Sequence, residues 1–287
     1  MNRMPRLGII GGSGLYEMPG LTNLETFDID TPFGKPSGDV MVGEVSGFDV
    51  AFIPRHGRHH HLSPTYVPYR ANIWALKSIG VKRLVSVSAV GSMREDVHPL
   101  DMLVPDQIFD RTTKRDRTFF DDMVVHVSLA DPFCEHARQT VIASVKDVGV
   151  PVHDGGTYVC IEGPQFSTRA ESRIYRSWGV DVIGMTAMPE ARLAREAGLC
   201  YVTLAMVTDY DVWHETEDAV SVQAVIENLR RNAAHAQSVV RAAVPGLHSD
   251  WDCGCGSALS GAIATAPDGI SPETRSRLAL FLDTART

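Results

Sequence analysis

The fold is decided by residues 181–211, which read DVIGMTAMPEARLAREAGLCYVTLAMVTDYD. Two apolar runs are typical of strands, Val182–Ile183 and Tyr201–Val207. Between them Ala191–Ala197 favours a helix, and Gly198 predicts where that helix ends. Two consecutive strands joined by a helix are expected to lie parallel in one sheet. The segment therefore predicts a strand–helix–strand unit of an α/β protein.

Polar side chains follow both of these strands. Met185 and Thr186 come after the first strand, and Asp209 and Asp211 come after the second. In open α/β sheets, ligands bind outside the carboxyl ends of the strands. Since parallel strands end at the same edge, we expect a thioether, a hydroxyl and two carboxylates to face one cleft.

The chain has 287 residues, of which 44% are hydrophobic and 22% are charged. This size and composition fit one large α/β domain, or one domain with an appendage. A net charge of −8 argues against a nucleic-acid partner. No apolar run reaches about 18 residues, so we expect no membrane span, and the first residues lack the apolar core of a signal peptide. Five scattered cysteines indicate a cytoplasmic protein.

The first predicted strand, Leu7–Ile10, runs into Gly11-Gly12-Ser13-Gly14. Glycines in such a turn allow backbone N–H groups to face an anion, and Ser13 adds a hydroxyl donor. The motif is neither a Walker loop nor a dinucleotide fingerprint, because the required lysine and third glycine are missing. A plain tight turn after a strand is an equally good interpretation of this motif by itself.

A hairpin is predicted from Val40–Val45 and Asp49–Ile53. Its second strand ends in a basic cluster, Pro54-Arg55-His56-Gly57-Arg58-His59-His60-His61. Arg55 offers a planar fork of donors and His56 offers one more, which suits a phosphate or a carboxylate. A metal site at the three histidines is disfavoured, because adjacent side chains point apart and the neighbouring arginines repel cations. A solvated basic loop is the simpler alternative.

A buried strand is predicted over Arg83–Ser88, and small residues follow it. It is the third predicted strand whose end carries a small hydroxyl residue. The three hydroxyls, from Ser13, Ser88 and Thr186, would surround one tetrahedral oxyanion together with Arg55. Each hydroxyl by itself is weak evidence, and the recurrence at strand ends is what indicates an anion site.

A further strand, Gly156–Cys160, leads into a Gly-Pro loop, and Ser167 or Thr168 is placed to cap the helix that follows. Phe166 lies at the tip of this loop. It either folds back into the core or stacks on a flat heterocycle. Glu162 either holds a sugar hydroxyl or pairs with an arginine.

Seven short motifs occur in a characteristic order. They are Gly11-Gly12-Ser13-Gly14, Asp30-Thr31-Pro32-Phe33-Gly34, Arg55-His56-Gly57, Tyr69-Arg70-Ala71-Asn72, Glu162-Gly163-Pro164, Met185-Thr186-Ala187-Met188-Pro189-Glu190 and Thr208-Asp209-Tyr210-Asp211. Together they resemble the trimeric purine nucleoside phosphorylase family, most closely its methylthioadenosine branch. The resemblance implies one α/β domain, residues 1–245, with a central mixed and partly barrel-like sheet flanked by helices. Residues 246–287 would form a C-terminal helical extension packed on that domain, and the chain would assemble as a homotrimer or a dimer of trimers.

The family's reaction is cleavage of the N-glycosidic bond of a purine nucleoside by inorganic phosphate. The resemblance therefore implies a pentosyltransferase with phosphate as co-substrate and with no metal or organic cofactor. The expected substrate is S-methyl-5'-thioadenosine, which would yield adenine and 5-methylthioribose 1-phosphate. Alternatives within the family are methylthioinosine and other 6-oxopurine nucleosides. Outside it, the chain would be a nucleoside-binding protein without turnover, or a hydrolase that uses water.

Site residues follow from the same resemblance. The implied phosphate-binding residues are Ser13, Arg55, His56, Ser88, Ala89 and Thr186. The implied substrate-binding residues are Met185 under the ribose, Phe166 on the base, Asp209 and Asp211 at the purine edge, Val220, Val222 and Val225 around the 5' group, and His126 from a neighbouring subunit. The expected catalytic set is Arg55, His56, Asp209 and Asp211.

The chemistry of the reaction agrees with these roles. As the glycosidic bond breaks, the purine gains negative charge, and an acid at its N7 stabilises the leaving group. Phosphate held by fixed donors supports the cationic sugar and then attacks it. Asp209 is the candidate at N7, with a raised pKa if it is buried, and Asp211 would accept from the exocyclic amine. Two carboxylates suit a 6-amino purine, whereas a 6-oxo purine is better matched by an asparagine amide.

Among the departures from the family pattern, one lies near the base, and the C-terminal tail is less familiar. Gly184 stands where many relatives place an asparagine, which leaves one polar contact near the base in question. The tail contains Trp251-Asp252-Cys253-Gly254-Cys255-Gly256. Its Cys-Gly-Cys is a zinc half-site that needs two more ligands, a redox pair such as the disulfide of some relatives from hot environments, or two free thiols. Short helices are predicted over Ala258–Ala264 and Arg275–Leu282.

Overall fold

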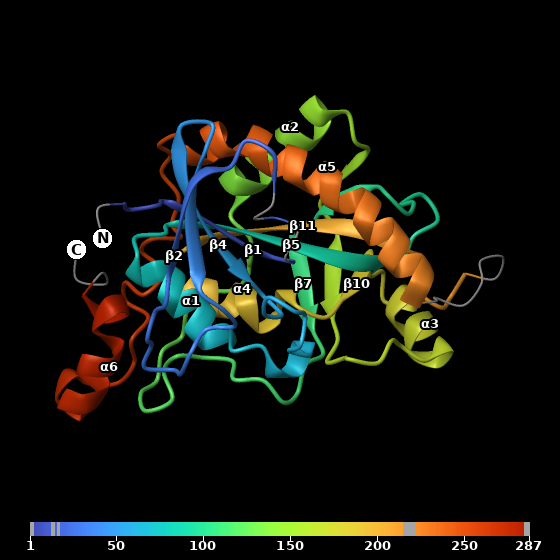
Figure 1. Cartoon of the computed structure of the whole chain (residues 1–287). Coiled ribbons are helices and arrows are strands. Elements are labelled where there is room, and N and C mark those ends of the chain that lie inside the picture. Colours follow the sequence, from blue (N-terminus) through green and yellow to red (C-terminus); the bar gives the residue numbers. More distant parts are fainter. Residues whose placement is uncertain (1–2, 13–14, 16–17, 215–221, 284–287) are drawn as a thin grey trace.

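A computed structural model of the chain describes residues 3–12, 15, 18–214 and 222–283 (Figure 1). The strands are β1 (Leu7–Gly11), β2 (Thr22–Phe27), β3 (Val40–Val45), β4 (Phe48–Pro54), β5 (Arg83–Ser92), β6 (Met102–Val104), β7 (Gln107–Asp110), β8 (Val152–Asp154), β9 (Thr157–Cys160), β10 (Val182–Gly184) and β11 (Cys200–Asp209). The α-helices are α1 (Tyr69–Ser78), α2 (Glu135–Val148), α3 (Arg169–Ser177), α4 (Ala187–Glu196), α5 (Val222–His248) and α6 (Pro272–Leu282). Short 3₁₀ turns cover Pro64–Tyr66 and Pro267–Gly269.

All of these strands belong to one mixed sheet in the order β2-β3-β4-β1-β5-β10-β9-β7, from which β11, β6 and β8 branch at β5. Helices α2 and α5 cover one face of its centre, and α1 and α4 cover the other (Figure 1). Strand side chains alternate between the faces, so that Leu7 and Ile9 pack on the α2–α5 side while Ile10 packs on the α1–α4 side. The predicted fold class, a mixed and partly closed sheet flanked by helices, is confirmed.

Strand β5 is the branch point. Residues 83–86 pair in parallel with β1, residues 83–91 pair in parallel with β11, and residues 91–92 pair antiparallel with β10. On the edge that β1 and β10 share, residues 87–90 therefore lie between two partners, and no described strand pairs with them there. We call this gap the open edge of β5, and it is where backbone groups remain available to a ligand.

The predicted parallel arrangement of the 182–183 and 201–207 strands is wrong. Since β10 runs antiparallel to β5 and β11 runs parallel to it, the two strands oppose each other. The reason is that β10 has only three residues and already runs back along β5. Helix α4 continues in that direction to the start of β5, where Cys200 pairs with Arg83 and β11 begins. In a parallel crossover the helix by itself leads the chain back to the start of the next strand. Here β10 and α4 together lead it back to the start of β11.

Several local predictions are confirmed. Strands β3 and β4 form the hairpin, and Ser46 and Gly47 take the positive φ values, 53° and 82°, that a two-residue turn needs. Thr168 caps α3 in a reciprocal capping box with Glu171. In contrast, the helix predicted over Ala258–Ala264 is wrong, because this segment forms successive turns in which Gly261 has a φ of 70°.

The tail returns to the main body of the molecule. Helix α6 is capped by Ser271, and its Phe281 packs against Phe119 with ring centroids 4.5 Å apart. Helix α5 runs through the predicted boundary at residue 245 and ends at His248, so the division into 1–245 and 246–287 stays a prediction. Among the helices described, none has the length and apolarity to cross a membrane.

Candidate active site

The parallel strands β4, β1 and β5 bring Arg55 to the open edge of β5. Arg55 follows β4, and its backbone N–H donates to the Gly11 carbonyl at the end of β1, 3.0 Å away. Its Nη1 donates to the Val87 carbonyl oxygen at 2.9 Å, one residue before Ser88. Two of the predicted phosphate-binding residues, Arg55 and Ser88, therefore meet at one place.

A buried carboxylate holds the Arg55 guanidinium. Nε and Nη2 donate to the two oxygens of Glu190 at 2.9 and 3.1 Å, and the Tyr201 hydroxyl donates to Glu190 at 3.0 Å. Burial lowers the pKa of Arg55, but the Glu190 charge raises it overall, so the guanidinium stays charged. Of its five N–H groups, one on Nη1 has no acceptor among the described residues and is available to a ligand. Glu190 is the last residue of the motif that begins at Met185, but sequence analysis assigned it no role in holding Arg55.

Three hydroxyl groups gather beside the open edge, from Ser88, Tyr158 and Thr186, and we call them the hydroxyl cluster. The Tyr158 hydroxyl lies next to the Ser88 side chain and the Thr186 backbone, and it is fully buried. All three hydroxyl oxygens are buried, and none has a hydrogen-bond partner among the described residues. A buried hydroxyl without a partner costs about 1–3 kcal/mol, so a cluster of three indicates a polar ligand.

Tyr158 also explains the glycine at position 184. A Cβ atom on Gly184 would lie 1.9 Å from the Tyr158 hydroxyl oxygen, which no side chain tolerates. The tyrosine hydroxyl therefore occupies the space that a side chain at position 184 would need. Sequence reasoning missed Tyr158, although an unusual glycine facing a buried aromatic strand residue was the signal that could have found it. Burial raises the pKa of Tyr158, so it remains a neutral donor.

The backbone at Ala89 faces the same place. The Val87 carbonyl points to the open edge, where it accepts from Arg55, and the Val90 carbonyl points to the opposite edge, where it accepts from Thr208. Backbone groups alternate between the two edges from one residue to the next. The Ala89 N–H therefore points to the open edge, beside the hydroxyl cluster.

The two aspartates lie at the carboxyl end of β11. Asp209 accepts from the Thr208 hydroxyl at 2.7 Å and from the Asp211 backbone N–H at 2.8 Å. Asp211 takes a φ of 53°, and its Oδ2 is buried without a partner among the described residues. Burial raises the pKa of both carboxyl groups.

Gly91 joins this acid pair to the rest of the site. A Cβ on Gly91 would lie 2.9 Å from Asp209 Oδ1 and 3.1 Å from Ile183, which leads through β10 toward Thr186. The structure thus brings Arg55, Thr186 and Asp209 to one region around β5, although β10 arrives from the direction opposite to the expected one.

His56 differs from the expected donor. Its Nδ1 lies 2.8 Å from the Leu62 carbonyl oxygen, which only accepts, so Nδ1 carries the hydrogen. Burial, reinforced by the Arg55 charge, lowers the pKa of His56 to about 4. The ring is therefore neutral at pH 7, and its Nε2 is an acceptor that matches a protonated phosphate oxygen better than a bare one.

The remaining predicted residues have different outcomes. Glu162 pairs with Arg115 at 3.0 Å, which confirms the second of its two interpretations. Arg115 also donates to the Met185 carbonyl at 2.7 Å and so fixes the residue expected under the ribose. Phe166 is 45% exposed and does not fold back into the core. His126 is exposed, and its backbone N–H donates to the Ala262 carbonyl of the tail.

Some expectations fall where the structure gives no side chain. Ser13 and Val220 lie outside the described residues. Val222 and Val225 belong to the first turns of α5, where only the backbone is described. The roles of these four residues stay predictions.

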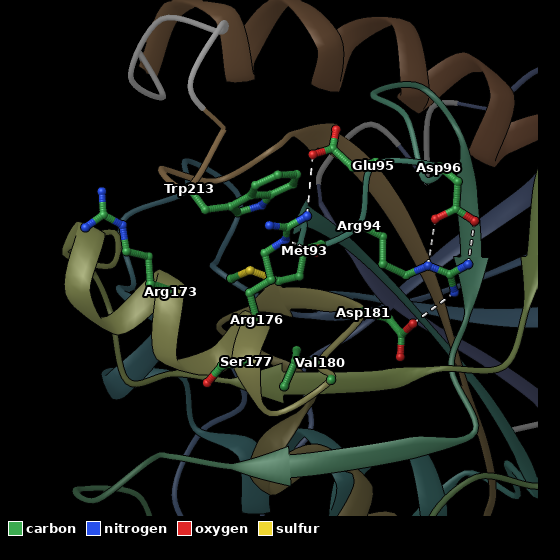
Figure 2. A pocket seen from close by; sticks show the side chains of 11 residues that line it. Met93, Arg94, Glu95, Asp96, Arg173, Arg176, Ser177, Val180, Asp181 and Trp213 are labelled. Carbon is green, nitrogen blue, oxygen red and sulfur yellow. Dashed lines mark hydrogen bonds and ion pairs between the residues drawn. The ribbon is translucent and has the colours of Figure 1, made fainter.

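A cavity of about 740 Å³ is lined by residues of α3, residues after β5 and Trp213 (Figure 2), and neither Asp209 nor Asp211 lines it. Most of the charged groups there already pair with each other, since Arg94 contacts Asp96 and Asp181, and Arg176 contacts Glu95. The unpartnered polar atoms define the candidate site better than this cavity does.

Comparison with known proteins agrees with the fold. Residues 6–245 match the family model described as the phosphorylase superfamily. A solved methylthioadenosine phosphorylase from an antarctic soil metagenomic library superposes with a TM-score of 0.94 at 50% identity, covering 98% of this chain and 99% of that one. The Schistosoma mansoni methylthioadenosine phosphorylase in complex with adenine gives 0.82 at 34% identity, covering 98% of both chains.

Curated relatives define the branch. The S-methyl-5'-thioadenosine phosphorylase of Koribacter versatilis is 52% identical over 277 residues, which cover 96% of this chain and 95% of the relative. That of Geobacter sulfurreducens is 51% identical over 96% of this chain and 97% of its own. The chain belongs to the phosphorylase superfamily and, within it, to the family of S-methyl-5'-thioadenosine phosphorylases.

Proposed function

We propose that this chain cleaves S-methyl-5'-thioadenosine with inorganic phosphate and releases adenine and 5-methylthioribose 1-phosphate. One observation carries the proposal: the unpartnered hydroxyl cluster and the buried acid pair lie along the same strand, β5, one beside Ser88 and the other beside Gly91. An anion site and a site for a heterocycle are thus separated by about three residues of strand, roughly 10 Å, which suits a ribose between them.

Phosphate binds at the open edge of β5. The donors are the free N–H of Arg55, the backbone N–H of Ala89 and the hydroxyls of Ser88, Tyr158 and Thr186, joined by the predicted Ser13. His56 Nε2 accepts from the protonated phosphate oxygen. The groups are fixed before substrate arrives, because Glu190 and the Leu62 carbonyl hold the two basic side chains. Preorganised donors of this kind align the attacking oxygen with C1' and avoid reorganisation during the reaction.

The purine binds at the acid pair. Protonated Asp209 donates to N7 as the glycosidic bond breaks, and Asp211 accepts from the exocyclic amine. The raised pKa of Asp209 supports the protonated form, and the unpartnered Oδ2 of Asp211 supports its role as an acceptor. Phe166 covers the base and Met185 lies under the ribose. A 6-oxopurine would turn a second acceptor toward Asp211, so the 6-oxopurine alternative is not favoured.

The same proposal includes the setting of the enzyme. The reaction needs phosphate but no organic cofactor, and no metal takes part in the chemical step. The enzyme is a cytoplasmic homotrimer in which His126 of one subunit closes the 5' pocket of the next, where Val222 and Val225 contact the methylthio group. Exposure of His126 on the single chain supports this arrangement. Light scattering measures the assembly, and a monomeric active enzyme would contradict it.

Phosphate-dependent release of adenine tests the function. The purified chain is incubated with S-methyl-5'-thioadenosine, methylthioinosine or inosine, each with and without phosphate. We expect adenine and the sugar phosphate only when phosphate is present, and the highest kcat/KM for methylthioadenosine. Adenine release without phosphate would indicate a hydrolase, binding without turnover would indicate a binding protein, and preference for inosine would reject the assigned specificity.

A further inference from the structure

Four of the five cysteines meet beneath the C-terminal tail, far from the acid pair. They are Cys134, Cys200, Cys253 and Cys255, and we call them the thiol cluster. Their four Sγ atoms all lie within 4.8 Å of one another, and all four thiols are free. We propose that the thiol cluster binds one structural Zn²⁺ ion, which fastens the tail to the main domain. The resemblance predicted no metal, and the proposal departs from that prediction at this site only.

The spacing of the sulfur atoms fits tetrahedral zinc. With a Zn–S bond of about 2.3 Å, the sulfurs of a tetrahedral tetrathiolate are about 3.8 Å apart. The Cys134–Cys253 separation is 3.9 Å and the Cys200–Cys253 separation is 3.3 Å. The tail's Cys-Gly-Cys lacked two ligands for zinc when only the sequence was considered, and Cys134 and Cys200 supply them.

Rigid elements hold the two ligands that come from the main domain. Cys200 is the first residue of β11, and Cys134 is the N-cap of α2, with its backbone N–H donating to the Tyr201 carbonyl at 2.8 Å. The tail reaches them by passing directly over Gly198. A Cβ there would lie 3.2 Å from the Gly256 carbonyl oxygen, and Gly198 has a φ of 64°. A glycine at this position therefore allows the Cys255–Gly256 backbone to approach.

The charges around the thiol cluster favour a metal thiolate. Four thiolates and one Zn²⁺ carry a net charge of −2. Arg195 Nη1 donates to the Cys255 sulfur at 3.7 Å, and Arg83 lies opposite Cys200 in the pairing of β5 with β11. The Arg83 guanidinium stacks 3.5 Å over Trp251, so it cannot swing away freely.

The start of α2 contributes to the same preference for negative charge. Cys134 is the N-cap of α2, where the positive end of the helix dipole favours a negatively charged sulfur. Two arginines and a helix N-terminus thus balance part of the negative charge of a tetrathiolate. Zinc loading is then a proton exchange, in which one Zn²⁺ replaces the four thiol protons and no electron is transferred.

Metal content provides the first test. The full-length chain is produced with zinc in the medium, freed of its affinity tag, dialysed against chelator-treated buffer and analysed by plasma mass spectrometry. We expect about one zinc ion per chain. The Cys253→Ser and Cys255→Ser variants should each lose at least about nine-tenths of it. Cys160→Ser is the matched control, since the fifth cysteine lies on β9 outside the cluster, and it should keep its zinc.

Cobalt provides the second test. Exchange with Co²⁺ should produce the strong visible and sulfur-to-metal bands of a tetrahedral tetrathiolate, and Cys255→Ser should abolish them. Arg195→Met should weaken zinc binding about tenfold without removing it, because it perturbs only the surroundings of the ligands.

Two outcomes would overturn the proposal. In the first, intact mass under non-reducing conditions shows hydrogens lost to disulfides. In the second, four titratable thiols bind no zinc or cobalt when either metal is added. Catalytic turnover does not enter the test, so failure of the zinc proposal and failure of the proposed function are separate results.

Discussion

The two ends of β11 place two very different buried polar clusters in one molecule. Cys200 begins the strand and belongs to the thiol cluster, and Asp209 ends it and belongs to the acid pair. The ten residues of β11 separate them by about 30 Å. At the first end, polar atoms from the core and the tail converge on each other. At the second end, the hydroxyls and Asp211 Oδ2 lack partners among the described residues and face a site that a substrate can fill.

This difference shows that opposite edges of one sheet can serve stability and catalysis separately. The carboxyl edge of the parallel strands gathers donors and acceptors whose hydrogen bonds, in our proposal, are completed by substrate. The amino edge gathers side chains that complete one another and attach the tail. We therefore expect changes at one end of β11 to affect turnover and changes at the other end to affect metal content, with little transfer between them. The predictions below test that separation, beginning with the largest expected effect.

Asp209→Asn should have the largest effect. Loss of the acid at N7 is expected to lower kcat/KM for methylthioadenosine by about 10³-fold. The amide should at the same time shift the preference toward 6-oxopurine nucleosides. Zinc content and melting temperature should stay as in the wild type. Asp96→Asn changes an exposed aspartate and is the matched control. An equal loss of kcat/KM for 6-amino and 6-oxo purine nucleosides would contradict the proposed role of Asp209 at the base. Loss of zinc would contradict the expected independence of turnover and metal content.

Glu190→Gln changes a residue at the carboxyl edge that we expect to affect both stability and phosphate binding. Removing the charge leaves Arg55, which is 2% exposed, without its carboxylate, at a cost of about 3–5 kcal/mol in the free energy of unfolding. We also expect a higher KM for phosphate, because the guanidinium loses its fixed orientation. Urea denaturation and steady-state kinetics measure the two effects. Glu95→Gln, at an exposed ion pair, should change neither the free energy of unfolding nor the KM for phosphate. A stable variant with normal phosphate binding would contradict our account of Arg55.

Tyr158→Phe removes one hydroxyl from the hydroxyl cluster and keeps the ring that covers Gly184. We expect KM for phosphate to rise about tenfold, since a hydrogen bond to a charged group contributes about 1.5 kcal/mol or more. Stability should not fall, because the hydroxyl has no partner among the described residues. Tyr66→Phe, on an exposed tyrosine, is the control. An unchanged KM for phosphate would remove Tyr158 from the site.

The pH dependence of turnover should give a smaller effect. Burial raises the pKa of Asp209, and the protonated form is the active one, so kcat/KM should fall as pH rises through that pKa. The Asp209→Asn variant cannot lose this proton and should lack the decline. Profiles measured at saturating phosphate for both proteins give the comparison. A decline of the same shape in the variant would assign it to another group.

The lowered pKa of His56 predicts that stability falls at acidic pH. Its pKa is about 4 in the folded chain and about 6.5 when unfolded, so the unfolded chain binds more protons between these values. The contribution of neutral His56 to stability is therefore present above about pH 6.5 and is lost as pH falls toward 4. Denaturant midpoints between pH 7 and 4 should decline less in His56→Asn than in the wild type. Parallel declines would show that His56 titrates normally.

Local sequence was sufficient for much of the fold and for several residues of the candidate site. The β3–β4 hairpin depends on two turn residues, and the α3 cap depends on Thr168 and Glu171, three residues apart. Such features are decided by short-range sterics and hydrogen bonds, which a sequence pattern contains. The polar residues after strand ends were recognisable for the same reason, so Arg55, Ser88 and Asp209 were found as candidates before their distances were known.

Contacts between distant residues were decided only by the packing of the whole chain. Arg55 meets Glu190 across 135 residues, and Cys134 meets Cys253 across 119. The direction of β10, the place of Tyr158 over Gly184 and the closing of the thiol cluster all depend on which strand pairs with β5 and where. That choice balances burial over the entire sheet, and no window of neighbouring residues contains it.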